Sequence, residues 1–132
     1  MKKIIIDTNS YARLLAGDDN VLGAISSAET IYMSVFVLGE LYAGFAGGAK
    51  KRENMDTLQR FLMKPAVKIL NATAETAEVF GQVKFNLKRS GTPLPINDVW
   101  IAACCMEVGG TLLTRDRHFE VVEQIESIIV KA

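Results

Sequence analysis

The sequence is poor in the residues that crosslink small secreted proteins or bind zinc, with two cysteines and one histidine among 132 residues. Cys104 and Cys105 are neighbours. Neighbouring side chains on a helix project in different directions, so these thiols are poorly placed to form a disulfide with each other. Two thiols without histidines at ligand spacing do not form a zinc site either. We therefore interpret the pair as buried free thiols in a reducing cytoplasm.

A long apolar run is also absent. The best candidate, 99–106, is bracketed by Asp98 and Glu107 and is much shorter than the ~20 residues of a membrane-spanning helix. Near the start of the chain, Asp7 interrupts the apolar run too early for a signal peptide. We therefore expect a cytoplasmic protein that has no membrane partner.

Neither sign of charge is in excess, since Lys+Arg and Asp+Glu number 15 each and the net charge is zero. This balance argues against a protein that coats nucleic acid non-specifically, but it leaves room for a local basic patch. Linkers rich in proline, glycine or serine, repeats and low-complexity segments are missing as well. With 132 residues, 49% of them hydrophobic, the chain is expected to form a single domain over 1–132 with a sizeable core.

What the sequence contains is an alternation of short apolar segments and helical patterns. This alternation predicts an α/β fold, with a mostly parallel central sheet of four to five strands and helices on both faces. Apolar and β-branched residues predict strands at 4–6, 30–35, 66–70 and 111–114, and a short fifth strand at 127–130. Helices are expected at 9–15, 21–28, 51–63 and 98–108, with one that carries Glu40 and ends at 47–48, and a long one between Thr73 and Gly91.

Local signals also predict where some helices begin and end. Asp19 or Asn20 is expected to cap the 21–28 helix. Asn97 is expected to cap the 98–108 helix, which Gly109 should end in the left-handed conformation. The preceding segment, TPLPI at 92–96, is not expected to form regular structure because of its two prolines.

Four acidic residues are expected at comparable places, at the carboxyl end of a strand or in the first turns of a helix: Asp7, Glu40, Asp98 and Asp116. Taken singly, each has a structural explanation, such as helix capping by Asp7 or a favourable position of Asp98 in its helix dipole. In a parallel sheet these places meet at one edge, where four acids repel one another unless a cation neutralises them. Oxygen-only ligands point to Mg²⁺ or Mn²⁺, and such a site supports phosphodiester hydrolysis.

Three segments, in this order, resemble the PIN-domain nucleases and, more narrowly, the VapC toxins of bacterial toxin–antitoxin pairs. They read IIIDTNSYARLL (4–15), SVFVLGELYAG (34–44) and GTPLPINDVWIAACCMEVGGTLLTRDRHF (91–119). Each motif is short, but the ordered set of DTN, a glutamate in an apolar helix, ND-x-x-IAA and LLTRD is specific. The resemblance implies a PIN-like fold over nearly the whole chain.

The resemblance also assigns residues. It implies that Asp7, Glu40, Asp98 and Asp116 are catalytic and bind Mg²⁺ or Mn²⁺ as the cofactor. Thr8, Asn9 and Thr114 match the polar positions around these acids, and Asn97 stands beside Asp98 in the ND pair. One departure is Val37, where the family often has a threonine three residues before the helix glutamate. This departure removes a polar partner but no metal ligand.

The function implied by the resemblance is that of a metal-dependent endoribonuclease, which acts on RNA as the toxin of a toxin–antitoxin pair. A homodimer and a cognate antitoxin protein that docks near the acids are implied as partners. The apolar segments 35–45 and 99–106 independently favour a homodimer, because they carry more hydrophobic surface than a two-sided sheet of this length is expected to cover. Housekeeping RNA processing is the main alternative; a non-catalytic binding module and a phosphoacceptor domain fit the acids less well.

The remaining charged residues near the acids are open to two interpretations. Arg13, Arg115 and Arg117 are candidates for contacts with RNA phosphates, or they merely balance the acids. His118, the single histidine, follows Asp116 closely. We expect it to have no catalytic role, because a metal-bound water needs no imidazole base.

Overall fold

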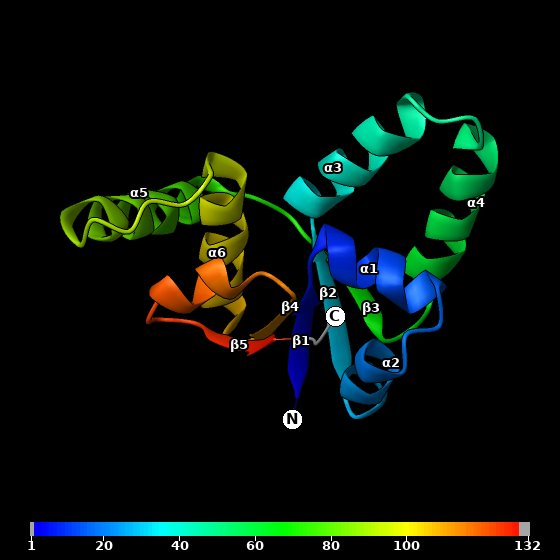
Figure 1. The fold of residues 1–132 in the computed structure, drawn as a ribbon, viewed down its shortest axis with the longest axis horizontal. Coiled ribbons are helices and arrows are strands. Elements are labelled where there is room, and N and C mark those ends of the chain that lie inside the picture. Colours follow the sequence, from blue (N-terminus) through cyan, green and yellow to red (C-terminus); the bar gives the residue numbers. More distant parts are fainter. Residues whose placement is uncertain (1, 130–132) are drawn as a thin grey trace.

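The structure is a computed structural model that describes residues 2–129. Its five strands form one parallel sheet, as the sequence pattern predicted, and their order in the sheet is β3-β2-β1-β4-β5 (Figure 1). The expected position 130 of the fifth strand lies outside the described residues. The strands are β1 (Lys3–Ile6), β2 (Thr30–Ser34), β3 (Val67–Leu70), β4 (Thr111–Thr114) and β5 (Glu126–Ile129).

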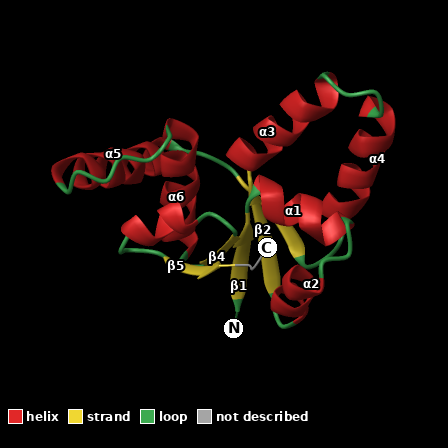
Figure 2. Cartoon of the chain, viewed as in Figure 1, coloured by secondary structure: helices red, strands yellow, loops and turns green. Residues whose placement is uncertain are grey.

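Helices lie on both sides of this sheet, with α5 and α6 on one side of the view and α1 to α4 on the other (Figure 2). The pair α3 and α4 projects beyond the strands (Figure 1). Within residues 2–129, no helix is both long enough and apolar enough to span a membrane. The helices are α1 (Thr8–Leu15), α2 (Asp19–Ser26), α3 (Val35–Ala46), α4 (Lys51–Leu62), α5 (Ala74–Arg89) and α6 (Ile96–Val108), followed by the 3₁₀ helix η1 (Arg117–Val121).

The core forms around the central strands, whose apolar runs are covered on both faces, as parallel sheets require. Ile4, Ile5 and Ile6 of β1 are fully buried, and so are Leu112 and Leu113 of the neighbouring β4. A second, smaller cluster joins α5 to α6. It consists of Val83, Leu87, Val99, Ala102 and Val122. The long arm of α5 is therefore held to the rest of the chain mainly through α6.

The two cysteines are free and buried on α6, as the sequence predicted. Burial raises the pKa of the Cys104 thiol to about 11, so it stays protonated and unreactive at neutral pH. The other apolar residues of α6 between 99 and 105 are buried, whereas Trp100 on α6 and Phe36, Tyr42 and Phe45 on α3 are partly exposed. The homodimer stays a prediction, which rests on these partly exposed side chains of segments 35–45 and 99–106 and on the family resemblance.

Two expected helix starts are wrong. Helix α2 is capped by Asp18, whose side chain accepts from the amides of Asn20 and Val21, and not by Asp19 or Asn20 themselves. Helix α6 begins at Ile96, inside the segment expected to be irregular, with Pro95 at the N-cap and no side-chain cap. Because the helix starts earlier, Asn97 lies in its first turn and does not cap it. The left-handed end at Gly109 is confirmed by its φ of 66°.

The strand order places the ends of β1 and β4 side by side. β2 and β3 follow on one side of β1, whereas β4 and β5 lie on the other, so the direction of the winding reverses between β1 and β4. Ligands of such sheets bind beyond the carboxyl ends of the strands at this reversal. The buried hydroxyl of Ser10 donates to the Leu113 carbonyl at 2.7 Å, which fastens the first turn of α1 to the end of β4.

Gly110, between α6 and β4, is the tightest backbone approach in this region. A Cβ there would overlap Cδ1 of the fully buried Ile5 and lie 3.1 Å from the Lys3 carbonyl oxygen. We predict that Gly110→Ala lowers the free energy of unfolding by about 1–3 kcal/mol, because the core has to shift to admit the methyl group. Thermal melts of the purified protein measure this effect.

Gly23→Ala in α2 is the matched control, because nothing lies within 4 Å of its added Cβ. It should stabilise the protein by up to about 1 kcal/mol through helix propensity. A Gly110→Ala protein that melts at the wild-type temperature would contradict the packing described here.

Candidate active site

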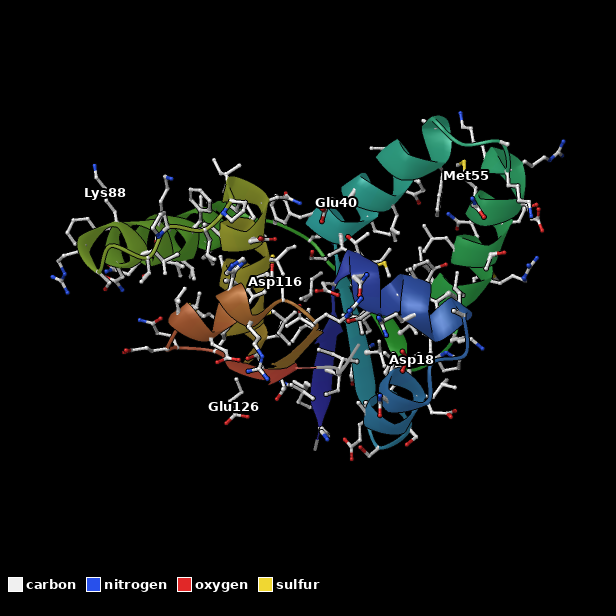
Figure 3. The ribbon with its side chains drawn as sticks, in the orientation of Figure 1. Asp18, Glu40, Met55, Lys88, Asp116 and Glu126 are labelled. Atoms are coloured by element: carbon white, nitrogen blue, oxygen red, sulfur yellow. The ribbon has the colours of Figure 1, made fainter. Side chains whose placement is uncertain are left out.

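A cavity of about 340 Å³ opens at the reversal point of the sheet and contains all four of the acids singled out in the sequence. Figure 3 shows Glu40 on α3 and Asp116 ahead of η1 near the centre of the molecule. The cavity also has the apolar side chains of Ile101 and Phe119. Its full lining is Asp7, Thr8, Asn9, Glu40, Asp98, Ile101, Arg115, Asp116 and Phe119.

Asp7 follows β1 directly and is the N-cap of α1. Its Oδ1 accepts from the backbone amide of Ser10 at 2.8 Å, and the residue is only 9% exposed. Capping and placement at the cavity are therefore both true of this side chain. A carboxylate at the end of a buried strand is tolerated because its helix donates to one oxygen while the other stays available.

Glu40 reaches the cavity from the second turn of α3, and Thr8 positions it. The Thr8 hydroxyl donates to Glu40 Oε1 at 3.0 Å, across from α1. Val37, which replaces the polar residue expected one turn earlier, is fully buried in the core. The Thr8 hydroxyl thus supplies a polar partner for the glutamate that Val37 does not provide.

Asp116 follows β4 and is the N-cap of η1. Its Oδ1 accepts from the His118 amide at 2.8 Å and lies 2.9 Å from His118 Nδ1. The buried Thr114 hydroxyl accepts from the Asp116 amide at 3.0 Å, which fixes the turn after the strand. His118 is 80% exposed in its side chain and is not part of the cavity lining.

Asp98, in the first turn of α6, is the acid with the least favourable surroundings. Burial, followed by repulsion from Asp116, Glu40 and Asp7, raises the pKa of its carboxyl group above the ordinary value. Among residues 2–129 it receives no hydrogen bond that offsets these effects. The helix dipole alone does not compensate for placing this charge among three others.

The chemistry of the four side chains fits a hard divalent cation. Asp7, Glu40 and Asp116 each have one oxygen held by a donor of the protein, which leaves the second oxygen of each and both oxygens of Asp98 as donors. Within the described part of the chain, however, no three His, Cys, Asp or Glu side chains converge closely enough to form a ready-made metal cluster. The acids therefore line the walls of the cavity without converging on one point.

The structure separates the three candidate arginines. Only Arg115 lines the cavity. Arg13 forms a salt bridge with Asp18, which lies away from Glu40 and Asp116 in Figure 3. Arg117 pairs with Glu120 at 2.8 Å, one turn along η1. Asn97 is not among the lining residues, whereas Thr8 and Asn9 are.

Two features of the site were not singled out in the sequence. Ile101, one turn after Asp98 on α6, and Phe119, on η1, give the cavity an apolar part. Beside the site, Trp100 stacks between Phe80 and Phe36, with ring centroids 3.9 and 5.0 Å apart. Trp100 is only partly buried. In the sequence, the only local signal for these features was the i, i+3 spacing of Asp98 and Ile101, which places the two side chains on the same side of the helix.

The family follows from a comparison with known proteins. A family model described as PIN domain matches residues 4–125, which is most of the chain. The chain belongs to the PIN-domain family. The order DTN, helix glutamate, ND and LLTRD that suggested it therefore has its structural counterpart in the four-acid cavity.

Relatives within the family are ribonucleases named VapC. The chain is 29% identical over 97 residues to Ribonuclease VapC2 of Rickettsia felis, covering 74% of this chain and 71% of the relative. It is 26% identical over 98 residues to Ribonuclease VapC4 of Mycobacterium tuberculosis, and the match covers 74% of this chain and 75% of the relative. The crystal structure of VapBC2 from Rickettsia felis, bound to a promoter DNA fragment, contains a chain that superimposes on this one with a TM-score of 0.84 at 23% identity. The match covers 98% of this chain and 99% of that chain. This last likeness confirms the fold.

The raised pKa of Asp98 generates a stability prediction. Between the ordinary and the raised pKa the folded protein binds more protons than the unfolded chain, so the free energy of unfolding falls as the pH rises through this interval. We predict that metal-free Asp98→Asn melts above the wild type at about pH 7.5, and that the difference shrinks as the pH is lowered into the ordinary aspartate range.

Asp56→Asn, an exposed position on α4 outside the cavity, is the control that changes the net charge equally. It should leave the melting temperature close to that of the wild type. If Asp98→Asn melts below both proteins at neutral pH in EDTA, Asp98 is stabilising and the repulsion described here is absent.

Proposed function

We propose that this chain is a metal-dependent endoribonuclease, which hydrolyses RNA phosphodiester bonds as the toxin of a toxin–antitoxin pair. The observation that carries the proposal is the meeting of Asp7, Glu40, Asp98 and Asp116 in one cavity at the reversal point of the sheet. Membership of the PIN-domain family and two relatives named as VapC ribonucleases support it.

In this proposal the four carboxylates hold Mg²⁺ or Mn²⁺. When bound, the cation activates water and stabilises the negative charge that develops on the phosphate. The chain's own contribution is to hold the acids in place before the cation arrives. The Ser10 amide holds Asp7, the Thr8 hydroxyl holds Glu40, and the turn built by Thr114 holds Asp116.

The substrate contacts in this proposal come from the other walls of the cavity. Arg115, the one candidate arginine in the lining, is placed to attract a phosphate toward an otherwise negative site. Ile101 and Phe119 offer apolar surface for a base or ribose. An unpaired strand or loop presents its bases and phosphates to such a cavity, whereas a duplex does not, so single-stranded RNA is the proposed substrate.

The proposed protein partner is a cognate antitoxin that docks near the acids, in a cytoplasmic setting. The VapBC2 structure from Rickettsia felis, whose fold this chain shares, is a complex of such a pair. A homodimer is proposed on the same resemblance. His118 is proposed to orient Asp116 through its contact with Oδ1, without acting as a base.

Cleavage of RNA by the purified protein tests the proposal. In total RNA with Mg²⁺, we expect wild-type cleavage at mapped sites, a fall of at least about 100-fold in Asp98→Asn, and complete loss in excess EDTA. Asp98→Asn preserves the shape of the side chain, so the change in rate reports the charge.

Asp56→Asn serves again as the control, and it should cut RNA at the wild-type rate. Undiminished cleavage by Asp98→Asn would remove that residue from the catalytic set. Cleavage that persists in EDTA would exclude the metal mechanism and direct attention to His118.

A further inference from the structure

A second cavity, of about 210 Å³, lies along the outer part of α5 and is unused by the proposed mechanism. Figure 1 shows the 90–95 segment returning alongside α5 to the start of α6, and the cavity lies between these elements. Two lysine side chains stand at an otherwise apolar surface. The groove is lined by Lys84, Leu87, Lys88, Pro93, Leu94 and Val99.

The groove is close to the acidic cavity because both share the first turn of α6. Val99 lines the groove, and the preceding residue, Asp98, lines the acidic cavity. Lys84 and Lys88 are one helical turn apart and lie on the same side of α5 as Phe80. From Phe80 to Lys88 this stripe extends by about 12 Å, at ~1.5 Å per residue.

An aromatic stack connects this stripe with α3, which carries one of the acids. Phe80 lies 3.9 Å from Trp100, centroid to centroid, with the rings 19° from parallel, and Trp100 is stacked on Phe36 at 12°. Phe36 stands one turn before Glu40 on α3. All three rings are partly exposed. A continuous strip of aromatic and cationic side chains thus runs from the neighbourhood of Glu40 to Lys88.

The two lysines of this strip form no salt bridge among residues 2–129, whereas Arg89 lines a neighbouring cavity together with Glu120 and Glu123. The last six residues of α5, KFNLKR at 84–89, contain three cations and no acid. Among residues 2–129, none of these cations takes part in a salt bridge, whereas Arg13 and Arg117 both do. Cations at the end of a helix favour its dipole, but that effect does not explain the apolar floor between the lysines.

Beside the groove, the exposed Phe85 has the chemistry of a stacking surface. Its ring is 57% exposed, and the Arg89 guanidinium lies 5.6 Å from its centroid. Positive grooves with aromatic side chains that stack on bases are the general solution for binding single-stranded nucleic acid. A second copy of this chain is a poorer occupant, because a twofold axis here would bring like charges together.

We propose that this groove binds the RNA strand next to the segment that is cut. Lys84 and Lys88 contact backbone phosphates, and a base lies on the accessible apolar surface of Pro93 and Leu94, beneath which Leu87 and Val99 are buried. The inference rests on the proposed ribonuclease function and extends it, because it assigns a second contact surface that runs along α5 from the first turn of α6.

The test compares two double variants in full-length protein that carries Asp98→Asn, with Mg²⁺ present, so that bound RNA stays intact. Lys84→Gln/Lys88→Gln changes the groove, and Lys64→Gln/Lys68→Gln, at exposed positions just after α4 and in β3, removes the same charge elsewhere. Fluorescence anisotropy measures binding of a labelled 12-nucleotide single-stranded RNA and a labelled trinucleotide of mixed sequence.

For the 12-mer, the groove variant should bind about 10-fold more weakly at low salt, and the slope of log K against log salt should fall by about 1.4, for two lost phosphate contacts. The control variant should match the parent. The trinucleotide, which is too short to reach both sites, should bind all three proteins alike.

Equal binding of the 12-mer by the groove variant and its parent overturns the groove assignment alone, provided that the wild type cuts RNA. Equal losses in both double variants, or a loss that extends to the trinucleotide, also overturn it. A change of oligomeric state in the groove variant, measured by light scattering, would make the groove a protein interface. A wild-type chain that neither cuts RNA nor binds the 12-mer contradicts both proposals.

Discussion

Repulsion among four carboxylates is the constraint on which the rest of this structure depends. The pairing of β1 with β4 brings Asp7 and Asp116 to one edge of the sheet, and α3 and α6 deliver Glu40 and Asp98 to the same cavity. Burial of Asp98, followed by repulsion from the other three acids, raises the pKa of its carboxyl group. A fold that tolerates such a cluster must offset the charge locally and keep the rest of the molecule stable enough to carry it.

Local donors provide part of the offset. Two of the acids are N-caps, of α1 and η1, so that backbone amides already point at one oxygen of each. A threonine hydroxyl does the same for Glu40. Capping and cation binding are therefore complementary explanations of these residues. In each acid except Asp98, one carboxylate oxygen accepts a hydrogen bond from the described part of the chain. The fully buried apolar strands beneath them supply the stability.

Much of this arrangement was predictable from the sequence, because short apolar runs followed by acids mark the carboxyl ends of parallel strands. The order of the strands in the sheet was not predictable, since it depends on how the segments that connect the strands pack against the sheet. The predicted cap at Asn97 was wrong because Pro95 starts α6 earlier than the side-chain signals suggest. The salt bridge of Arg13 with Asp18 could not be predicted, because it depends on the left-handed turn at Gly17, which brings Asp18 back to α1. The groove along α5 arises from packing of the 90–95 segment and has no local signature.

The central claim is that the four carboxylates bind one kind of ligand together, a hard divalent cation. Binding of Mn²⁺ to the apo protein, followed by electron paramagnetic resonance, tests it without RNA. The account predicts saturable binding that weakens at least about 10-fold in Asp98→Asn and in Glu40→Gln, and that is unchanged in Asp56→Asn. Mn²⁺ binding that is equal in all four proteins would contradict it.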